Sequence, residues 1–468
     1  MAINETEPSA CPVSGAGGAE EQKERLRITM NRHASTYRTD FEKNTDELHA
    51  RCPIAWNDTH DGYWYVSGNQ ELMDTARRAD VLSNDADIHQ QRRGYKGINI
   101  PGPPPEGRTT IGGFLEMDPP EQRHYRQALN PYLSPAAVQR WQPVLDELTR
   151  ACVDEKIESG QIDFVDDLAN IVPAVFTMAI LGFPLKDWVV YCEPAHASVY
   201  TSPDDPDHAR VMDMAMKMGV RAFESIAEIK QTRKPGLADA LIRADINGHQ
   251  PDDMDLIGAV MLLIGGGFDT TTALTAHSLE WLSQHPEERD RLSRERETLL
   301  DSATEEFLRF YTPAQGDGRT ISQDVEIHGV QLREGERLWL SWAMANRDEK
   351  VFDEPHRVRL DRSGNRHASF GLGIHRCIGS NVARAAFKTM VRHVLDRMPD
   401  FVCDPAGAVH YDTTGVINGM KHLPATFTPG KRLGPGLEET IAAVQVACDE
   451  QGLAEPVTRR KDGAELDL

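Results

Sequence analysis

Cys377 stands among glycines in the stretch Phe370-Gly371-Leu372-Gly373-Ile374-His375-Arg376-Cys377-Ile378-Gly379, and the residues after it predict a helix. A free thiol has a pKa of roughly 8.5, so a thiolate at neutral pH needs stabilisation. A loop that enters a helix N-terminus supplies backbone N–H groups and the positive end of the helix dipole, and a metal ion completes the deprotonation. The glycines leave room for a large flat group. These residue types predict a metal–thiolate centre.

A second unusual stretch lies in the middle of a long helix predicted over residues 252–284, and it reads Leu263-Ile264-Gly265-Gly266-Gly267-Phe268-Asp269-Thr270-Thr271-Thr272. Each glycine in a helix interior costs about 1 kcal/mol relative to alanine, so a purely structural helix would not favour three of them. Threonine hydroxyls can bond back to a carbonyl and bend the helix. The composition suits a helix that lies against a flat cofactor and admits a small molecule and water.

Both stretches resemble motifs of the cytochrome P-450 family. Its heme-binding loop has the pattern Phe-x-x-Gly-x-Arg/His-x-Cys-x-Gly, and every fixed position is met, by Phe370, Gly373, His375, Cys377 and Gly379. The helix motif Ala/Gly-Gly-x-Asp/Glu-Thr is matched by residues 266–270. The resemblance covers roughly residues 50–430 and implies a mainly α fold with small β-sheets in a single large domain. It also implies heme b ligated by Cys377. The bland alternative is a buried structural cysteine in an ordinary loop.

By this resemblance, Thr270 would hydrogen-bond bound dioxygen, and Asp269 would gate the proton relay from solvent. Peroxide-using relatives lack this acid–alcohol pair, so dioxygen is the expected co-substrate. A helix kink without chemistry is the alternative interpretation of the same residues.

The resemblance also implies which residues hold the cofactor. Asp118-Pro119-Pro120 predicts a helix start, and Gln122 and Arg126 follow it four residues apart on one face. They match the family positions beside a heme propionate, although the family more often has His where Gln122 stands. Arg319 and His375 match the other propionate positions. Phe370, Gly371 and Gly266 would lie against the heme.

Two further groups of residues are expected around the cofactor. Glu306 and Arg309 form a Glu-x-x-Arg pattern on one helix face, which resembles the family's structural ion pair, and Arg357 would be its third partner. The substrate pocket would be lined by Phe268, Pro313, Ala314, Val416 and Ile417. The glycine- and proline-rich residues 94–113 would cover this pocket, because long irregular segments in compact domains are often lids.

The formal net charge of −22 argues against nucleic acid as a partner, since phosphate binding needs clustered cations. No signal peptide is recognised, and no membrane anchor is expected, because no run approaches the ~20 apolar residues of a membrane span. The seven cysteines are scattered without a CxxC pair, which suggests neither a disulfide framework nor a zinc ribbon. The expected location is the cytoplasm.

The sequence carries no flavin or Fe–S signature, so electrons must come from another protein. A ferredoxin with its ferredoxin reductase, fed ultimately by NAD(P)H, is the expected source. A basic stripe of Arg384, Lys388 and Arg392 is either a solvated helix face or, with Arg376, a docking patch for an acidic donor.

Three segments are expected: a flexible tail at residues 1–35, the heme domain at 36–430, and a C-terminal extension at 431–468 with an amphipathic helix over 437–451. The expected activity is insertion of one atom of dioxygen into an apolar organic substrate. Two alternatives stay open. One is a heme-thiolate enzyme that performs peroxygenation or isomerisation, and the other is a non-enzymatic heme protein.

Overall fold

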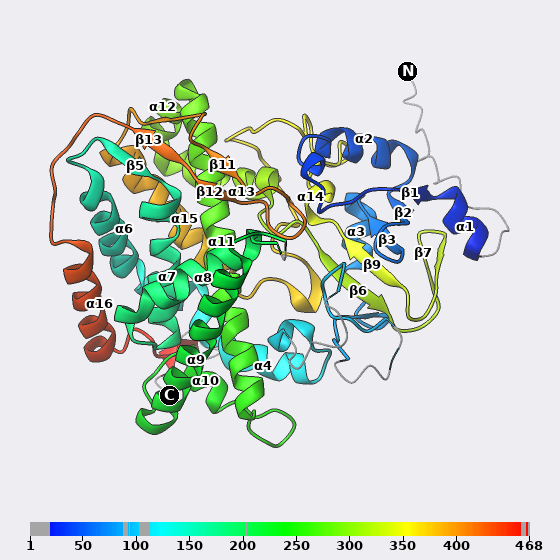
Figure 1. The fold of residues 1–468 in the computed structure, drawn as a ribbon, viewed down its shortest axis with the longest axis horizontal. Helices are drawn as coiled ribbons and strands as arrows, with labels where there is room; N and C mark the ends of the chain where they lie inside the picture. Colours follow the sequence, from blue (N-terminus) through cyan, green and yellow to red (C-terminus); the bar gives the residue numbers. More distant parts are fainter. Residues whose placement is uncertain are drawn as a thin grey trace.

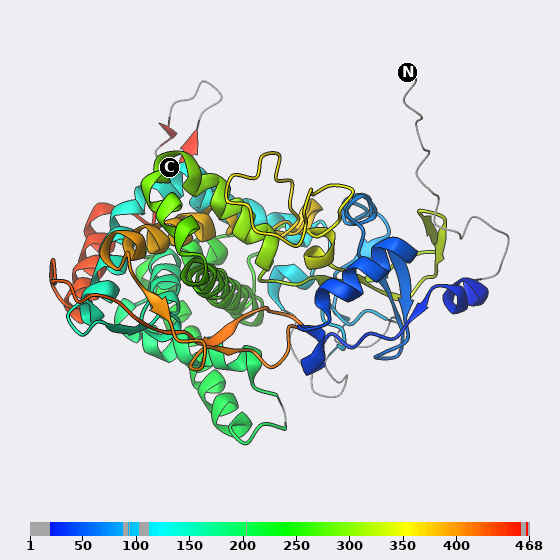
Figure 2. The same cartoon turned by 90° about the horizontal axis from the view of Figure 1, so that it is seen from above.

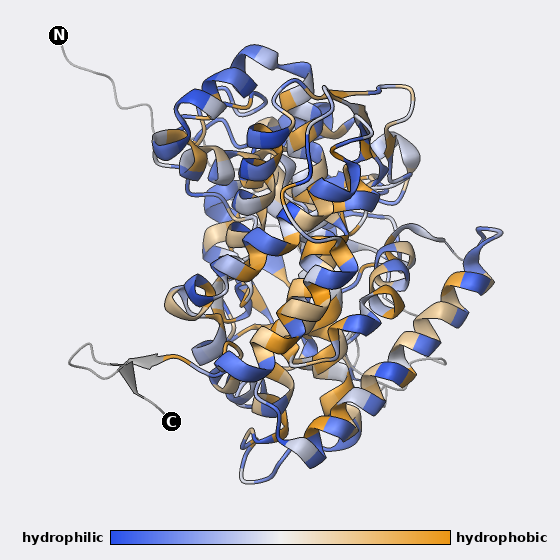
Figure 3. Cartoon of the chain, turned by 90° about the vertical axis from the view of Figure 1, so that its left-hand side faces the viewer, coloured by the Kyte–Doolittle hydropathy of each residue, from blue (hydrophilic) through white to orange (hydrophobic). Residues whose placement is uncertain are grey.

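The computed structural model describes residues 19–87, 92, 94–102, 112–202, 204–459 and 465–466. Helices form the larger part of the molecule, and a mixed β-sheet with short helices forms the smaller part beside them (Figures 1 and 2). The predicted mainly α class with small sheets is confirmed. Apolar residues gather in the interior helices, and the outer helices alternate between apolar and polar positions (Figure 3).

The largest sheet has six strands in the order β1-β2-β3-β9-β6-β4. Their bounds are β1 Arg27–Ile28, β2 Ile54–Asn57, β3 Tyr63–Val66, β9 Arg337–Leu340, β6 Asp317–Ile321 and β4 Leu82–Ser83. Strands β6 and β9 are antiparallel, with Arg319 opposite Leu338. The smaller strands are β5 Gln161–Asp163, β7 Val325–Ile327, β8 Val330–Leu332, β10 Val402–Cys403, β11 Val409–His410, β12 Met420–His422, β13 Pro424–Thr426, β14 Thr458–Arg459 and β15 Glu465–Leu466.

The helices differ widely in length, and short ones stand where the chain turns. Their bounds are α1 Ala19–Arg25, α2 Phe41–Arg51, α3 Asn69–Thr75, α4 Glu121–Leu133, α5 Pro135–Arg140, α6 Gln142–Lys156, α7 Ile171–Leu181, α8 Trp188–Tyr200, α9 His208–Thr232, α10 Leu237–Ile242, α11 Asp253–Gln284, α12 Pro286–Arg294, α13 Arg296–Tyr311, α14 Trp342–Ala345, α15 Ser380–Arg397 and α16 Leu437–Gln451.

Helix α11 runs through the centre of the helical part (Figure 1). Its N-cap Asp252 accepts a hydrogen bond from the backbone N–H of Asp255, and Pro286 follows its end. Residues from Leu256 to Leu282 pack in the main hydrophobic cluster together with residues of α6, α7 and α15. Within the described residues, α11 is the helix whose length and apolarity would suit a membrane span, against the expectation that no such stretch exists. Half of that window is buried in the fold, as is usual for a core helix.

The residues near both ends of the described chain form part of the fold, where a flexible tail and a separate extension were expected. Residues 19–28 of the expected flexible tail form α1 and β1, and β1 pairs in parallel with β2. Helix α16 has the bounds predicted for the amphipathic helix, and its Ile441, Val444 and Cys448 are buried in the main cluster beside α6. The predicted helix therefore packs on the body of the protein. Residues 1–18 lie outside the described part of the chain.

The structure also bears on two other predictions, the state of the cysteines and the lid over the pocket. Cys52 is disulfide-bonded, which the scattered cysteine pattern did not suggest. The cysteines at 152, 192, 377, 403 and 448 are free. Of the expected lid at residues 94–113, the stretch 103–111 lies outside the described residues.

Candidate functional site

The loop before α15 presents Cys377. A short 3-10 helix, Gly373–His375, precedes the cysteine, whose backbone N–H donates to the carbonyl of Phe370 at 2.7 Å. Gly371 and Gly373 have φ of 64° and 69°, in the left-handed region that favours glycine. A Cβ at Gly373 would lie 2.7 Å from the carbonyl oxygen of Ala76. These two glycines are therefore required by the turn itself.

The side chain of Cys377 is exposed to solvent, yet protein atoms surround it closely enough that burial raises the pKa of the thiol. The backbone N–H of Gly379 and the guanidinium of Arg126 oppose this rise without reversing it. A thiolate at this position therefore needs a further positive charge, which a metal ion would provide.

The centre of α11 has an open face as well. Gly265 and Gly266 are exposed in the middle of this core helix, and a Cβ on either would meet no atom within 4 Å. At Gly267, one position further, a Cβ would lie 2.7 Å from Oγ1 of Thr177. The missing side chains thus leave free space on one side of the helix, as a flat cofactor requires.

Two basic residues, Arg126 and Arg319, lie within electrostatic reach of His375. Arg319 is 3% exposed, and burial lowers its pKa. Burial, together with Arg319 and Arg126, lowers the pKa of His375 to about 3. The carboxylate of Asp317 lies 4.0 Å from Arg319. This excess of basic groups suits a ligand with two carboxylates, and heme b carries two propionates. The donor set therefore fits that cofactor.

Gln122 and Arg126 belong to α4, and both bind the backbone of the cysteine loop. The amide of Gln122 donates to the carbonyl of Ile374 at 2.7 Å, and Arg126 donates to the carbonyl of Arg376 at 2.6 Å. Gln122 is 2% exposed, so its amide is committed to the loop backbone. Arg126 also lies within electrostatic reach of Cys377.

Asp269 is buried and belongs to a hydrogen-bonded cluster that crosses three segments. Its Oδ1 accepts from the Tyr411 hydroxyl at 2.6 Å and lies 2.7 Å from Nδ1 of His196 in α8. Nδ1 of His196 and the Tyr411 hydroxyl are 3.0 Å apart. The second oxygen, Oδ2, is buried without a hydrogen-bond partner among the described residues. Thr270 donates from Oγ1 to the carbonyl of Gly266 at 3.0 Å.

His196 and Tyr411 were not identified from the sequence. They lie 73 and 142 residues from Asp269, and neither belongs to a local motif. The signal in the sequence was weak: Tyr411 stands only five residues before Val416, which was expected to line the pocket.

The expected substrate residues are brought together with one exception. Ala314 bridges Ile417, and the backbone N–H of Asn418 donates to the carbonyl of Pro313 at 2.8 Å. Val416 is 45% exposed at the tip of this pairing. Phe268 is 3% exposed within the main cluster, about 200° around α11 from Gly266 at 100° per residue. The fold does not bring Phe268 together with Gly266.

The structural ion pair is formed as expected, but its third partner is different. Arg309 donates twice to Glu306 at 2.8 Å, and both side chains are fully buried. Arg362 is the third partner, with Nε 2.9 Å from Glu306. The prediction of Arg357 was wrong: its side chain is exposed and pairs with Glu354, and only its carbonyl accepts from Arg309.

The basic stripe on α15 is paired with acidic side chains. Arg384 binds both oxygens of Glu305, Lys388 lies 2.8 Å from Asp301, and Arg392 contacts Asp146. Arg384 also lies over the ring of Phe370, 4.4 Å from its centroid. Arg384 therefore supports the cysteine loop, and all three stripe residues have acidic partners.

The chain is similar to one protein family and to several known enzymes. The family model for Cytochrome P450 matches residues 186–399. A steroid C26-monooxygenase of Mycolicibacterium smegmatis is 28% identical over 404 residues, which span 82% of this chain and 89% of that protein. A linalool 8-monooxygenase of Pseudomonas putida is 28% identical and covers 81% of this chain and 93% of that protein. A methyl-branched lipid omega-hydroxylase of Mycobacterium tuberculosis is 27% identical, with 78% and 84% covered.

Solved structures show the same fold. A Mycobacterium marinum cytochrome P450 in complex with pseudoionone matches with a TM-score of 0.78 and 26% identity, over 86% of this chain and 99% of that one. A substrate-free cytochrome P450 from Bacillus megaterium matches with a TM-score of 0.74 and 26% identity, over 84% of this chain and all of that one.

Proposed function

The chain belongs to the cytochrome P450 family, and from that premise we propose that Cys377 is the thiolate ligand of its heme iron. The protein is a monooxygenase that places one atom of dioxygen into an apolar organic substrate. When bound, the heme supplies dioxygen binding and O–O cleavage, which a donating thiolate ligand favours. The observation that carries the assignment is the free and exposed thiol of Cys377 at the end of a glycine loop.

Arg126, Arg319 and His375 are proposed to bind the heme propionates. A buried guanidinium gains most from a charged oxygen partner, and Arg319 is nearly inaccessible. Gln122 takes an indirect part by fixing the loop through Ile374. Phe370, Gly371 and Gly266 are proposed to flank the ring plane, since the two glycines offer backbone without a side chain.

Asp269 and Thr270 are proposed to move protons to the reaction site. Thr270 presents a hydroxyl on the open side of α11, one residue from the buried carboxylate of Asp269. His196 and Tyr411 orient that carboxylate through two short hydrogen bonds. The acid–alcohol pair favours the dioxygen-using monooxygenase over peroxygenation or isomerisation.

The substrate is proposed to be an apolar, alkyl-rich molecule of terpenoid, steroid or branched lipid character. Support comes from the names of three relatives, a steroid C26-monooxygenase, a linalool 8-monooxygenase and a methyl-branched lipid omega-hydroxylase. Val416, Ile417, Ala314 and Pro313 are proposed as contacts, because they lie on paired segments whose tip carries an exposed valine. Phe268 was expected there too, and its place in the core favours a role in packing.

Electrons are proposed to come from NAD(P)H through a ferredoxin reductase and a ferredoxin in the cytoplasm. The exposed Arg376 next to Cys377 is the proposed contact for the acidic donor. The stripe on α15 is a weaker choice, because Arg384, Lys388 and Arg392 already have acidic partners. We also propose residues 36–430 as the heme domain, with 431–468 as an extension that packs on it.

The spectrum of the reduced protein under carbon monoxide tests the assignment of Cys377. We expect a Soret band at the red-shifted thiolate position, lost in Cys377→Ser and kept in Cys403→Ser, where a free cysteine in a distant strand is replaced. A histidine-type band in the unchanged protein, or a thiolate band that survives Cys377→Ser, would contradict the proposal.

A further inference from the structure

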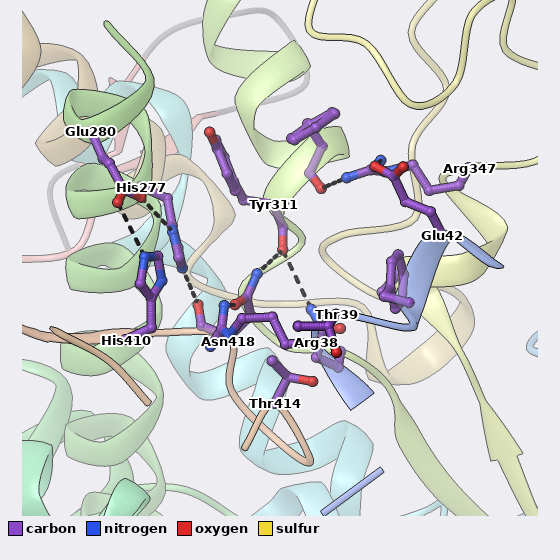
Figure 4. Close-up of a pocket in the computed structure, with 14 residues that line it drawn as sticks. Arg38, Thr39, Glu42, His277, Glu280, Tyr311, Arg347, His410, Thr414 and Asn418 are labelled. Carbon is purple, nitrogen blue, oxygen red and sulfur yellow. Dashed lines mark hydrogen bonds and ion pairs between the residues drawn. The ribbon is translucent and has the colours of Figure 1, made fainter. Parts of the chain in front are cut away.

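A second cluster of ligating side chains lies at the far end of α11. His277 and Glu280 are three residues apart on one face of this helix, and β11 brings His410 against them (Figure 4). Nε2 of His410 lies 3.1 Å from Oε1 of Glu280, and Nδ1 of His277 lies 3.8 Å from Oε2. Neither histidine nor the glutamate belongs to the site described above.

The ring of His277 is held so that one nitrogen lone pair faces this cluster. Its Nε2 lies 3.2 Å from the carbonyl oxygen of Asn418, so Nε2 carries the proton and Nδ1 is free to bind a metal. Metal-binding histidines usually donate their second ring N–H to such a carbonyl. The ring also stacks on Tyr311, with centroids 4.9 Å apart and planes within 9°. The orientation is therefore fixed before any ligand arrives.

Asn418 is itself fixed by its neighbours. Its side-chain oxygen accepts from Arg38 at 2.7 Å, and its amide donates to the carbonyl of Tyr311 at 3.1 Å (Figure 4). This second layer of contacts is what a preformed metal site needs, because it prevents the ligands from turning away.

The three side chains line a cavity of ≈ 360 Å³, which has room for an ion and several waters. Thr414 also lines this cavity, is 4% exposed, and has a hydroxyl without a hydrogen-bond partner among the described residues. An unpaired buried hydroxyl is costly, so it indicates a polar occupant such as water or a small anion.

We propose that His277, Glu280 and His410 bind a zinc ion in this cavity. Zn–N and Zn–O bonds of ~2.0–2.1 Å in a tetrahedron place the ligand atoms about 3.3–3.4 Å apart. The observed separations of 3.1 Å to Oε1 and 3.8 Å to Oε2 involve the two oxygens of Glu280, and one ligand atom from each of the three residues lies within 4.8 Å of the others. Small side-chain rotations would bring one carboxylate oxygen and the two ring nitrogens to the spacing of zinc ligands. Two histidines and one glutamate are a known zinc donor set that leaves the fourth position to water.

Arg38 lines the same cavity and lies within electrostatic reach of Glu280. Its guanidinium is turned to Asn418 and the carbonyl of Tyr411. It would favour a hydroxide or other anion in the fourth position.

A bound zinc would join α11 to β11, the strand that precedes the proposed pocket residues Val416 and Ile417. His410 directly precedes Tyr411, which bonds to Asp269, and residues 413–419 follow. The ion would therefore stabilise the position of this segment without contacting the heme.

The experiment uses the full heme-loaded enzyme, treated with EDTA, incubated with Zn²⁺ and dialysed. We expect one zinc per heme iron by elemental analysis, and no retained magnesium in a parallel sample, because Mg²⁺ prefers oxygen ligands. His410→Ala should weaken zinc binding at least ~10-fold, because replacing even a residue that only hydrogen-bonds to a metal ligand typically lowers metal affinity by that much. Zinc should raise the unfolding midpoint of the original protein and leave that of His410→Ala unchanged.

His422→Ala is the matched control, because His422 lies with Asp163 and Asp166 in another group of donor atoms at the surface. This variant should keep its zinc. Glu280→Gln gives a second test that retains the side-chain shape, and the carbon monoxide spectrum shows whether each variant is folded. The proposal fails if the original protein retains no zinc, if folded His410→Ala and Glu280→Gln retain as much as the original, or if His422→Ala alone loses it.

Discussion

Asp269 is a buried carboxylate within a cluster of hydrogen-bonded side chains. A carboxylate that is 2% exposed is costly unless its oxygens are paired, and Oδ1 has two partners while Oδ2 has none among the described residues. In the proposed proton relay, this unpaired oxygen would be the atom that exchanges a proton with water. Tyr411 and His196 fix the carboxylate, so they should influence how reliably protons arrive.

Tyr411→Phe tests this role at the level of one oxygen atom. Removing the hydroxyl leaves the ring packed against Tyr200 at 5.0 Å but deletes one donor to Asp269. We expect product formed per NAD(P)H consumed to fall, by up to ~10²-fold, with an increased solvent isotope effect. Thr270→Ala provides the uncoupled reference. Tyr200→Phe is the control, since Tyr200 contacts Tyr411 through its ring; equal coupling in the two Phe variants would exclude the role of Tyr411.

At the same scale, the sequence was informative where residues are neighbours along the chain. The loop of Cys377 and the Asp269–Thr270 pair were both predicted from short motifs, because a local turn or helix face determines their geometry. His196 and Tyr411 could not be predicted, because their contacts depend on how α8 and the segment after β11 pack on α11. Phe268 directly precedes Asp269 in the sequence, but its side chain lies in the main hydrophobic cluster, away from Gly266 on α11.

Among the elements, the segment between α14 and the cysteine loop depends on one buried carboxylate. Glu306 accepts from Arg309, from Arg362 and from the backbone N–H of Arg359. Spacing along α13 predicted the first of these contacts. The second comes from an irregular segment in which several arginines stand close together, so sequence alone selected Arg357, five residues too early.

Arg362→Ala should therefore destabilise the protein by about 3 kcal/mol, because it removes one partner from a fully buried ionic cluster. Arg357→Ala is the matched control and should change stability by less than ~0.5 kcal/mol, since that side chain is 72% exposed. Thermal unfolding followed by circular dichroism and by Soret absorbance measures both. A larger loss in the Arg357 variant would restore the original assignment.

For the whole molecule, the open question was what covers the apolar face of the C-terminal helix. An isolated amphipathic helix is marginal in water, so its stripe must be buried somewhere. The sequence predicted the helix bounds and its apolar side, but not the surface that it covers. In the fold, α16 packs on α6, and Arg150 of α6 donates to the Thr440 hydroxyl of α16 and to the carbonyl of Pro435 just before that helix. The extension is thus joined to the same core as the heme-side helices.

Two valines on α16 test that packing in solution. Val444 is 5% exposed within the main cluster, whereas Val446 is 52% exposed on the other side of the same helix. Val444→Ala should lower the free energy of unfolding by about 1–3 kcal/mol through lost contacts and a residual cavity. Val446→Ala should stay within ±0.5 kcal/mol. If the helix instead covers a partner protein, both variants of the isolated enzyme will unfold at the same midpoint as the original, and Val444→Ala will weaken only the complex.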